Sequence, residues 1–144
     1  MHMLAALEGE LAQLDVLAPG YASEWNAIAT SRASVLLEGP RHATQAAIAL
    51  LTPHMTAPIL FIRGGASCEM TSGEIGGVIL EDVGELSGED QERLVRWLDA
   101  ARPFTQTIAT TTSPLFHDVS RGRFGAALYY RLNVILVTVG TPGV

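Results

Sequence analysis

The sequence predicts a single α/β domain in three layers, with a five-stranded, mainly parallel sheet between two layers of helices. Short uninterrupted apolar runs alternate with helix-forming segments, and such runs are typical of parallel strands that are covered on both faces. The length of 144 residues suits one hydrophobic core. Because 48% of the residues are hydrophobic but only 6% are aromatic, we expect a core built mainly from Ala, Val, Ile and Leu.

A helix is expected first. Four leucines recur at helical spacing and predict one apolar stripe: Leu4, Leu7, Leu11 and Leu14. Pro19-Gly20 ends this helix. Residues 1–15 could be a linker helix from a longer protein or an additional covering helix, next to a domain that spans 16–144.

The remaining elements follow in alternation. We expect helices over 23–31, 43–51 and 87–101 and around Leu128, and strands over 35–37, 59–62, 78–80, 107–109 and 134–139. Ser23 and Ser87 are suitable N-caps for two of these helices. The pattern does not determine the order of the strands in the sheet.

Composition excludes several classes of function. The net charge is −6 and the nine basic residues are all arginines, which argues against direct nucleic-acid binding because phosphate contacts need a basic face. No apolar run approaches the roughly 20 residues that span a membrane. The single cysteine, Cys68, permits no internal disulfide and fits the cytoplasm. His42, His54 and His117 have no partner at ligand spacing, so no metal site is expected.

The most specific motif lies late in the chain. Gly122-Arg123-Phe124, followed by 128–134, resembles the segment Gly-Arg-Phe-Arg-x-Asp-Leu-Tyr-Tyr-Arg-Leu-Asn-Val of the sigma-54-dependent transcription activators. The segment from Gly76 to Leu86 resembles the Walker B strand of that family, and 108–112 resembles its sensor strand. This resemblance extends in the same order from about Val16 to Val137. It implies the P-loop NTPase fold of an AAA+ core, with ATP and Mg²⁺ as cofactors.

The phosphate-binding loop departs from the family. The family has Gly-Glu-x-Gly-Thr-Gly-Lys-Glu, whose amides wrap phosphate oxygens and whose lysine neutralises them. Here only Gly39 remains of the glycines, and the uncharged Gln45 replaces the lysine. Gly39, Thr44 and Gln45 are therefore nucleotide-binding residues by position only. Arg41 or His42 could still attract an anion at the helix start, and the alternative is a plain strand–loop–helix connection.

The Walker B carboxylates stand in reversed order, Glu81 before Asp82. Exchanging their lengths moves each carboxylate by roughly one C–C bond, and a displacement of about 1 Å can cost about a hundredfold in rate. The two residues could still bind a hard cation. Alternatively, they only solvate the end of the strand.

Other family positions have also changed. Thr112 replaces the sensor asparagine, and Gly125 replaces a candidate arginine finger. Arg131 matches a second arginine of the family and could act at a subunit interface or pair with a surface carboxylate. From Cys68 to Ile75 there is no room for the loop that touches sigma-54 in the family. Because little sequence follows Val139, we expect neither the family's helical lid nor a helix-turn-helix domain in these 144 residues.

We therefore expect a transcription-regulator module without ATPase activity that acts through protein–protein contacts. By resemblance its partners would be sigma-54 RNA polymerase or another regulator, and Arg123 and Arg131 are the candidate interface residues, including for self-association. One alternative is a weak ATP-binding or ATP-hydrolysing AAA+ domain that uses Glu81 and Asp82. Another is a structural domain of a longer response regulator.

Overall fold

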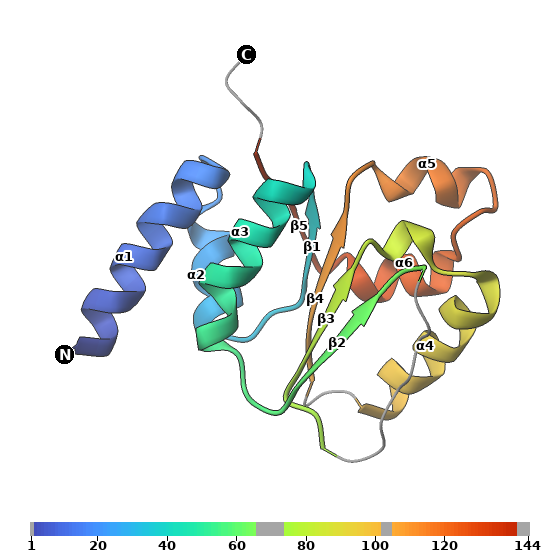
Figure 1. Ribbon diagram of the computed structural model, residues 1–144, viewed down its shortest axis with the longest axis horizontal. Coiled ribbons are helices and arrows are strands. Elements are labelled where there is room, and N and C mark those ends of the chain that lie inside the picture. The colour runs from blue at the N-terminus through green and yellow to red at the C-terminus, as the bar shows by residue number, and fades with distance from the viewer. Residues whose placement is uncertain (1, 66–73, 102–104, 141–144) are drawn as a thin grey trace.

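The five strands form one sheet in which every neighbouring pair is parallel, in the order β2-β3-β4-β1-β5 (Figure 1). The computed structural model describes residues 2–65, 74–101 and 105–140. The strands are β1 (Val35–Glu38), β2 (Ile59–Arg63), β3 (Gly77–Glu81), β4 (Gln106–Thr111) and β5 (Ile135–Thr138). All five lie where the apolar runs predicted them, and the predicted parallel sheet is confirmed.

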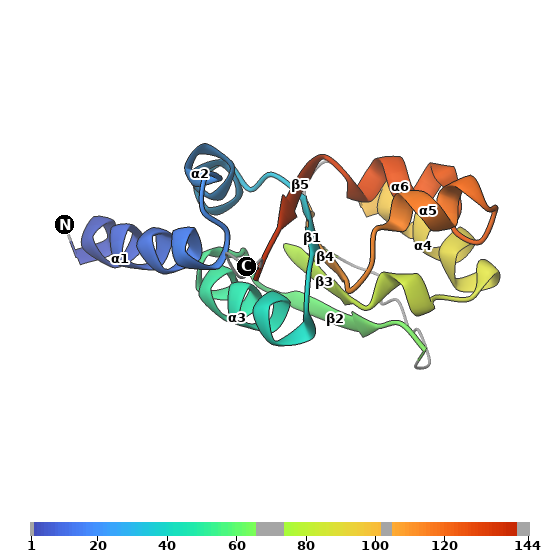
Figure 2. The ribbon, with the colours of Figure 1, turned by 90° about the horizontal axis from the view of Figure 1, so that it is seen from above.

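Six α-helices cover the two faces of the sheet. They are α1 (His2–Leu17), α2 (Ala22–Thr30), α3 (Arg41–Leu51), α4 (Gly88–Ala101), α5 (Leu115–Ser120) and α6 (Ala126–Leu132), with short 3-10 turns η1 (Thr52–His54) and η2 (Val83–Glu85). Figure 2 shows α1, α2 and α3 on one side of the sheet and α4, α5 and α6 on the other. The three predicted layers are thus present. No helix within the described ranges is both long and apolar enough to cross a membrane.

Each face of the sheet has its own apolar cluster. Strand β1 contributes to both, because Val35 and Leu37 face α1, α2 and α3, whereas Leu36 faces the opposite helices. All three side chains are completely buried. Strand β4, at the centre of the sheet, is buried along all six of its residues. The alternation of side chains along each strand therefore builds a core on both faces, as expected for strands without a solvent face.

Helix α1 packs onto this core through its C-terminal half. Leu14 is 1% exposed and belongs to the cluster that α2 and α3 cover. The His54 Nε2 atom lies 2.6 Å from the Glu10 carboxylate, and Gly140 donates its amide hydrogen to the Leu17 carbonyl at 2.7 Å. Two segments distant in sequence thus hold α1 to the domain.

Two local predictions differ in outcome. Ser87 caps α4 as expected, since its hydroxyl accepts a hydrogen bond from the Asp90 amide at 3.1 Å. Ser23 does not cap α2. That helix begins one residue earlier, after Tyr21, and the Ser23 hydroxyl instead donates to the Glu24 carboxylate at 2.8 Å. A neighbouring side chain competes here with the backbone for the same hydroxyl.

Helix α5 was not predicted from the sequence, which indicated only a polar connection before Phe124. It has six residues, follows Pro114 and buries only Leu115. A helix this short carries too few apolar residues to show a helical period.

The side chain of Gln106 on β4 connects this strand to the end of α2 and to the segment before β1. It is 3% exposed, and its amide nitrogen donates to the carbonyls of Ile28 and Ala33, each at 2.9 Å.

Gln106→Leu should therefore lower the free energy of unfolding by about 1–3 kcal/mol, or the melting temperature by roughly 3–10 °C. Thermal unfolding measures this, with Gln45→Leu on the exposed side of α3 as the control. Equal stability of the two variants would contradict the assignment.

Candidate functional site

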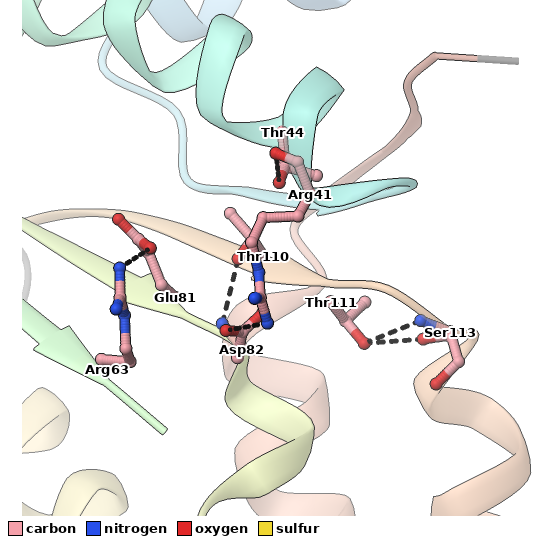
Figure 3. Close-up of polar contacts among 8 residues, drawn as sticks. All are labelled: Arg41, Thr44, Arg63, Glu81, Asp82, Thr110, Thr111 and Ser113. Carbon is pink, nitrogen blue, oxygen red and sulfur yellow. Dashed lines mark hydrogen bonds and ion pairs between the residues drawn. The ribbon is translucent and has the colours of Figure 1, made fainter. Parts of the chain in front are cut away.

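The carboxyl ends of β1, β3 and β4 meet at one edge of the sheet, which is where parallel α/β sheets bind ligands. Figure 3 shows the side chains gathered there. The Walker B-like Glu81 ends β3 and Asp82 follows it, and Arg41 and Thr44 lie in the first turn of the helix after β1. Thr110 and its neighbours end β4. The structure thus places the phosphate-loop, Walker B and sensor segments at the same edge of the sheet.

Each of the two carboxylates has an arginine of the same chain as its partner. Arg41 reaches the Asp82 carboxylate at 2.9 Å, and Arg63 reaches Glu81 at 3.1 Å (Figure 3). The carboxylate side chains are only 14% and 21% exposed, respectively, whereas both arginine side chains are 62% exposed. The negative charge at this edge is therefore neutralised by guanidinium groups that lie on its solvent side. Across the described residues, no group of three or more potential ligands is arranged to hold a metal ion.

The backbone of Asp82 is fixed in the left-handed region, with φ 54° and ψ 53°. Its amide hydrogen goes to the Thr110 hydroxyl at 3.0 Å. Aspartate tolerates this conformation better than most residues. The contact with β4 and the ion pair with Arg41 together hold the carboxylate against the start of α3.

The phosphate-loop position is a tight turn of two residues, because β1 ends at Glu38 and α3 begins at Arg41. Gly39 donates its amide hydrogen to the Thr111 carbonyl at 3.0 Å. The amides of Ala43 and Thr44 both donate to the Pro40 carbonyl at 3.0 Å. Pro40 itself has no amide hydrogen. These three amides are engaged within the chain, whereas the amides of Arg41 and His42 at the start of α3 have no acceptor among the described residues.

The end of β5 closes over the same turn. A Cβ atom at Gly39 would collide with the Val139 carbonyl, and one at Gly140 would collide with the Ala43 side chain. Gly39 is therefore required for the close approach of two backbones. The turn is collapsed onto the end of β5, with no room for a side chain at Gly39.

The other nucleotide-site positions point elsewhere. The Thr44 side chain is buried, and its hydroxyl donates to the Arg41 carbonyl at 3.0 Å. Gln45 is exposed on α3. Thr112, at the sensor position, is also exposed, while the Thr111 hydroxyl donates to the Ser113 carbonyl at 2.7 Å (Figure 3). None of these side chains is brought to the two carboxylates.

The arginine-finger-like Arg131 has an internal partner. Its guanidinium forms a two-pronged pair with the Asp99 carboxylate, at 2.7 and 2.9 Å, and also donates to the Ala127 carbonyl at 2.7 Å. The hydrogen bonds that this guanidinium donates to Asp99 hold the pKa of Arg131 above its ordinary value. Arg123 is exposed, and its side chain has no ion pair within the part of the chain that the structure describes. Of the two interface candidates, Arg123 is thus the one available to a partner.

Gln91 on α4 positions the segment around Arg123. Its side-chain oxygen accepts the Gly125 amide hydrogen at 2.8 Å, and its nitrogen donates to the carbonyls of Leu86 at 3.0 Å and Arg123 at 3.4 Å. The residue is 7% exposed. Gln91 was not predicted as a functional residue, although the loop that it holds contains the Gly122-Arg123-Phe124 motif.

Two further residues, Arg63 and Glu38, were not predicted, because the groups that they contact are remote in the sequence. Arg63 and Glu81 are direct neighbours in the register of β2 and β3, which only the strand order reveals. Glu38, at the end of β1, is half-buried, and this burial raises the pKa of its carboxyl while the charge of His117 on α5 lowers it by less. The segment that includes Cys68, where the family has its long loop, falls largely outside the described residues.

Comparison with solved structures shows the fold. NtrX from Brucella abortus in complex with ADP is similar over 88% of this chain and 38% of its own, with a TM-score of 0.65 and 16% identity. The P-loop NTPase domain of the sigma-54 transport activator from E. coli is similar over 83% of this chain and 94% of its own, with a TM-score of 0.53 and 14% identity. RuvB T158V from Thermotoga maritima is similar over 86% of this chain and 46% of its own, with a TM-score of 0.55 and 16% identity. No family model and no curated protein matches the sequence.

The chain spans less than half the length of the NtrX chain that it matches. At these identities the comparisons establish a common architecture and not a common activity.

Burial of Glu38 should make stability depend on pH. Because the folded state raises the pKa above its ordinary value of 4.5, ionised Glu38 lowers stability, and this penalty grows as the pH rises through the folded-state pKa. Glu38→Gln should raise the melting temperature at pH 7 by about 1–3 °C and have no effect near pH 4, where both forms are uncharged. Calorimetric scans across this range measure the difference. A gain that persists unchanged at pH 4 would show another cause, and Glu92→Gln on α4 is the control.

Removal of the Gln91 side chain should release the loop that bears Arg123. Gln91→Leu leaves the Gly125 amide and two carbonyls without a partner, which costs about 1–3 kcal/mol in the free energy of unfolding. Hydrogen exchange at Gly125 should accelerate more than exchange at the β4 amides. Uniform acceleration throughout the domain would show that Gln91 has no local effect on this loop.

The candidate site thus lies on a sheet and helix framework similar to those of NtrX, RuvB and the P-loop NTPase domain of the sigma-54 transport activator.

Proposed function

We propose that this chain is a transcription-regulator module of the sigma-54-activator kind that acts through protein contacts and does not hydrolyse ATP. The observation that carries the proposal is the double ion pair Arg41–Asp82 and Arg63–Glu81. Hydrolysis by a P-loop enzyme needs these carboxylates to hold Mg²⁺ and to orient water. Here each of the two carboxylates is paired with an arginine of the same chain, which supports the proposal.

The collapsed turn at Gly39 supports the same proposal. Phosphates bind where several amide hydrogens point outward from a strand–helix loop. Among the described contacts of this turn, the amides of Gly39, Ala43 and Thr44 already have acceptors in the chain. The lysine that would neutralise the phosphates is replaced by Gln45, whose side chain is exposed.

A protein partner is the role that remains for the surface on α5 and α6. Arg123 is exposed beside Gln91, and on the same pair of helices Phe116 is 60% and Tyr130 is 73% exposed. Their rings are joined through Tyr129, which lies 6.5 Å from Phe116 and 5.7 Å from Tyr130 between ring centroids. Arginine and aromatic residues are enriched at interface hot spots. By the sigma-54-activator likeness, the partner would be sigma-54 RNA polymerase or another regulator in the cytoplasm.

The second candidate function is weak ATP binding, which the shared fold favours because NtrX with this architecture was solved in complex with ADP. It requires Arg41 and Arg63 to release the carboxylates and the turn at Gly39 to open. Both changes cost free energy that only a tightly bound ligand could offset.

We expect no binding or turnover of Mg-ATP. Titration calorimetry should show no saturable heat, the melting temperature should be unchanged in about 1 mM Mg-ATP, since stabilisation requires binding, and phosphate release should equal the background. The matched variant is Glu81→Ala, which removes one of the two carboxylates. Saturable binding or phosphate release that disappears in Glu81→Ala would overturn the proposal and support the weak ATPase.

A further inference from the structure

The two edge strands of the sheet differ in how they are protected. Strand β2 follows Pro58 and ends at Arg63, which is ion-paired with Glu81. Charge and proline are the usual devices that prevent an edge strand from pairing with another chain. Strand β5 has neither, because residues 133–140 contain no charge and no proline. In Figure 2 these two strands lie at opposite margins of the sheet.

Among the described residues, the outer side of β5 is unpaired at Leu136 and Thr138, whereas the next outward amide, that of Gly140, donates to the Leu17 carbonyl of α1 at 2.7 Å. Val139 donates its amide hydrogen to the Glu38 carbonyl at 2.8 Å, so in the parallel register the amides of Val137 and Val139 face β1. Those of Leu136 and Thr138 consequently point away from it. No described residue forms a hydrogen bond with these outward backbone groups.

The side chains of β5 divide in the same way. Val137 and Val139 are completely buried, whereas Val134 is 59% and Leu136 is 39% exposed. Leu136 is the register partner of Leu36, so both lie on the face that α4, α5 and α6 cover. Tyr130 on α6 and Phe116 on α5 expose their rings in that same layer.

We propose that β5 pairs antiparallel with β5 of a second copy of this chain and joins the two sheets into one of ten strands. An antiparallel pair of identical strands is related by a two-fold axis, so each copy offers the same outward groups and the contact closes at two. The strand is uncharged, and its reversed copy therefore brings no like charges into register. The exposed Val134 and Leu136 supply apolar area on both sides of the axis.

The charge of the whole chain predicts how salt acts on this pairing. Each copy carries −6, and this repulsion is screened as salt rises, whereas the apolar contact is not weakened. The dimer should therefore strengthen with salt. An association through an ion pair between Arg123 and a carboxylate would instead weaken as the salt concentration rises. The pairing does not depend on the proposed function, because it uses a different surface from Arg123.

Sedimentation equilibrium of the full chain tests the proposal, at low salt and at about 0.3 M NaCl. We expect a monomer–dimer equilibrium that salt strengthens and that Leu136→Lys weakens by at least about tenfold, since a charge would be buried at the seam. Phe61→Lys is the matched control, since Phe61 is 61% exposed on the opposite edge strand. Circular dichroism checks that both variants are folded.

Hydrogen exchange supplies a second readout that does not require a variant. The amides of Leu136 and Thr138 should exchange more slowly at high protein concentration than at low concentration, whereas Val137 should be protected at both. A chain that stays monomeric, a dimer that Phe61→Lys or Arg123→Ala dissolves while Leu136→Lys does not, or aggregates without a discrete dimer would each overturn the proposal.

Discussion

The complete burial of β4 is the constraint on which the rest of the structure depends. A central strand of a parallel sheet is shielded on both faces, yet this one carries the polar residues Gln106, Thr107, Thr110 and Thr111. Buried polar groups need hydrogen-bond partners, and each unsatisfied one costs about 1–3 kcal/mol. The elements around β4 provide partners for several of these groups, although the Gln106 Oε1 atom is buried without a hydrogen-bond partner among the described residues.

Each partner fixes a different part of the chain. Gln106 holds the end of α2 and the entry to β1, and the Thr107 amide donates to the Ser34 hydroxyl at 2.9 Å. At the other end of the strand, Thr110 accepts the Asp82 amide hydrogen and thereby sets the carboxylate that Arg41 binds. The geometry of the candidate site thus depends on the hydrogen bonds that the buried polar residues of β4 form.

The ion pairs at the carboxyl edge follow from the same burial. Asp82 and Glu81 have side chains that are largely removed from solvent, and an ionised carboxylate there needs a nearby positive charge. A metal ion supplies that charge in an active P-loop enzyme. In this chain Arg41 and Arg63 supply it from within, and an internal partner competes at a high effective concentration with any ion from solution.

The sequence predicted the strands well because each is a short apolar run with a clear boundary. It also predicted the cap at Ser87, where hydroxyl and helix start are adjacent in the chain. The two arginine–carboxylate pairs could not be predicted, because Arg63 and Glu81 become neighbours only through the strand order. Likewise, the collapse of the turn at Gly39 involves Val139, which lies 100 residues later. Motif reasoning identified the changed residues, whereas their new contacts required the fold.

The segment that closes the phosphate turn is also the end of the unprotected edge strand. Val139 and Gly140 pack on Gly39 and Ala43, and the Gly140 amide is bonded to the Leu17 carbonyl of α1. These contacts fix the end of β5 by packing alone, without a ligand. A strand that is rigid before it binds loses little conformational entropy when it pairs. The contacts that pack the phosphate turn therefore also fix the end of β5 in the conformation that the proposed pairing requires.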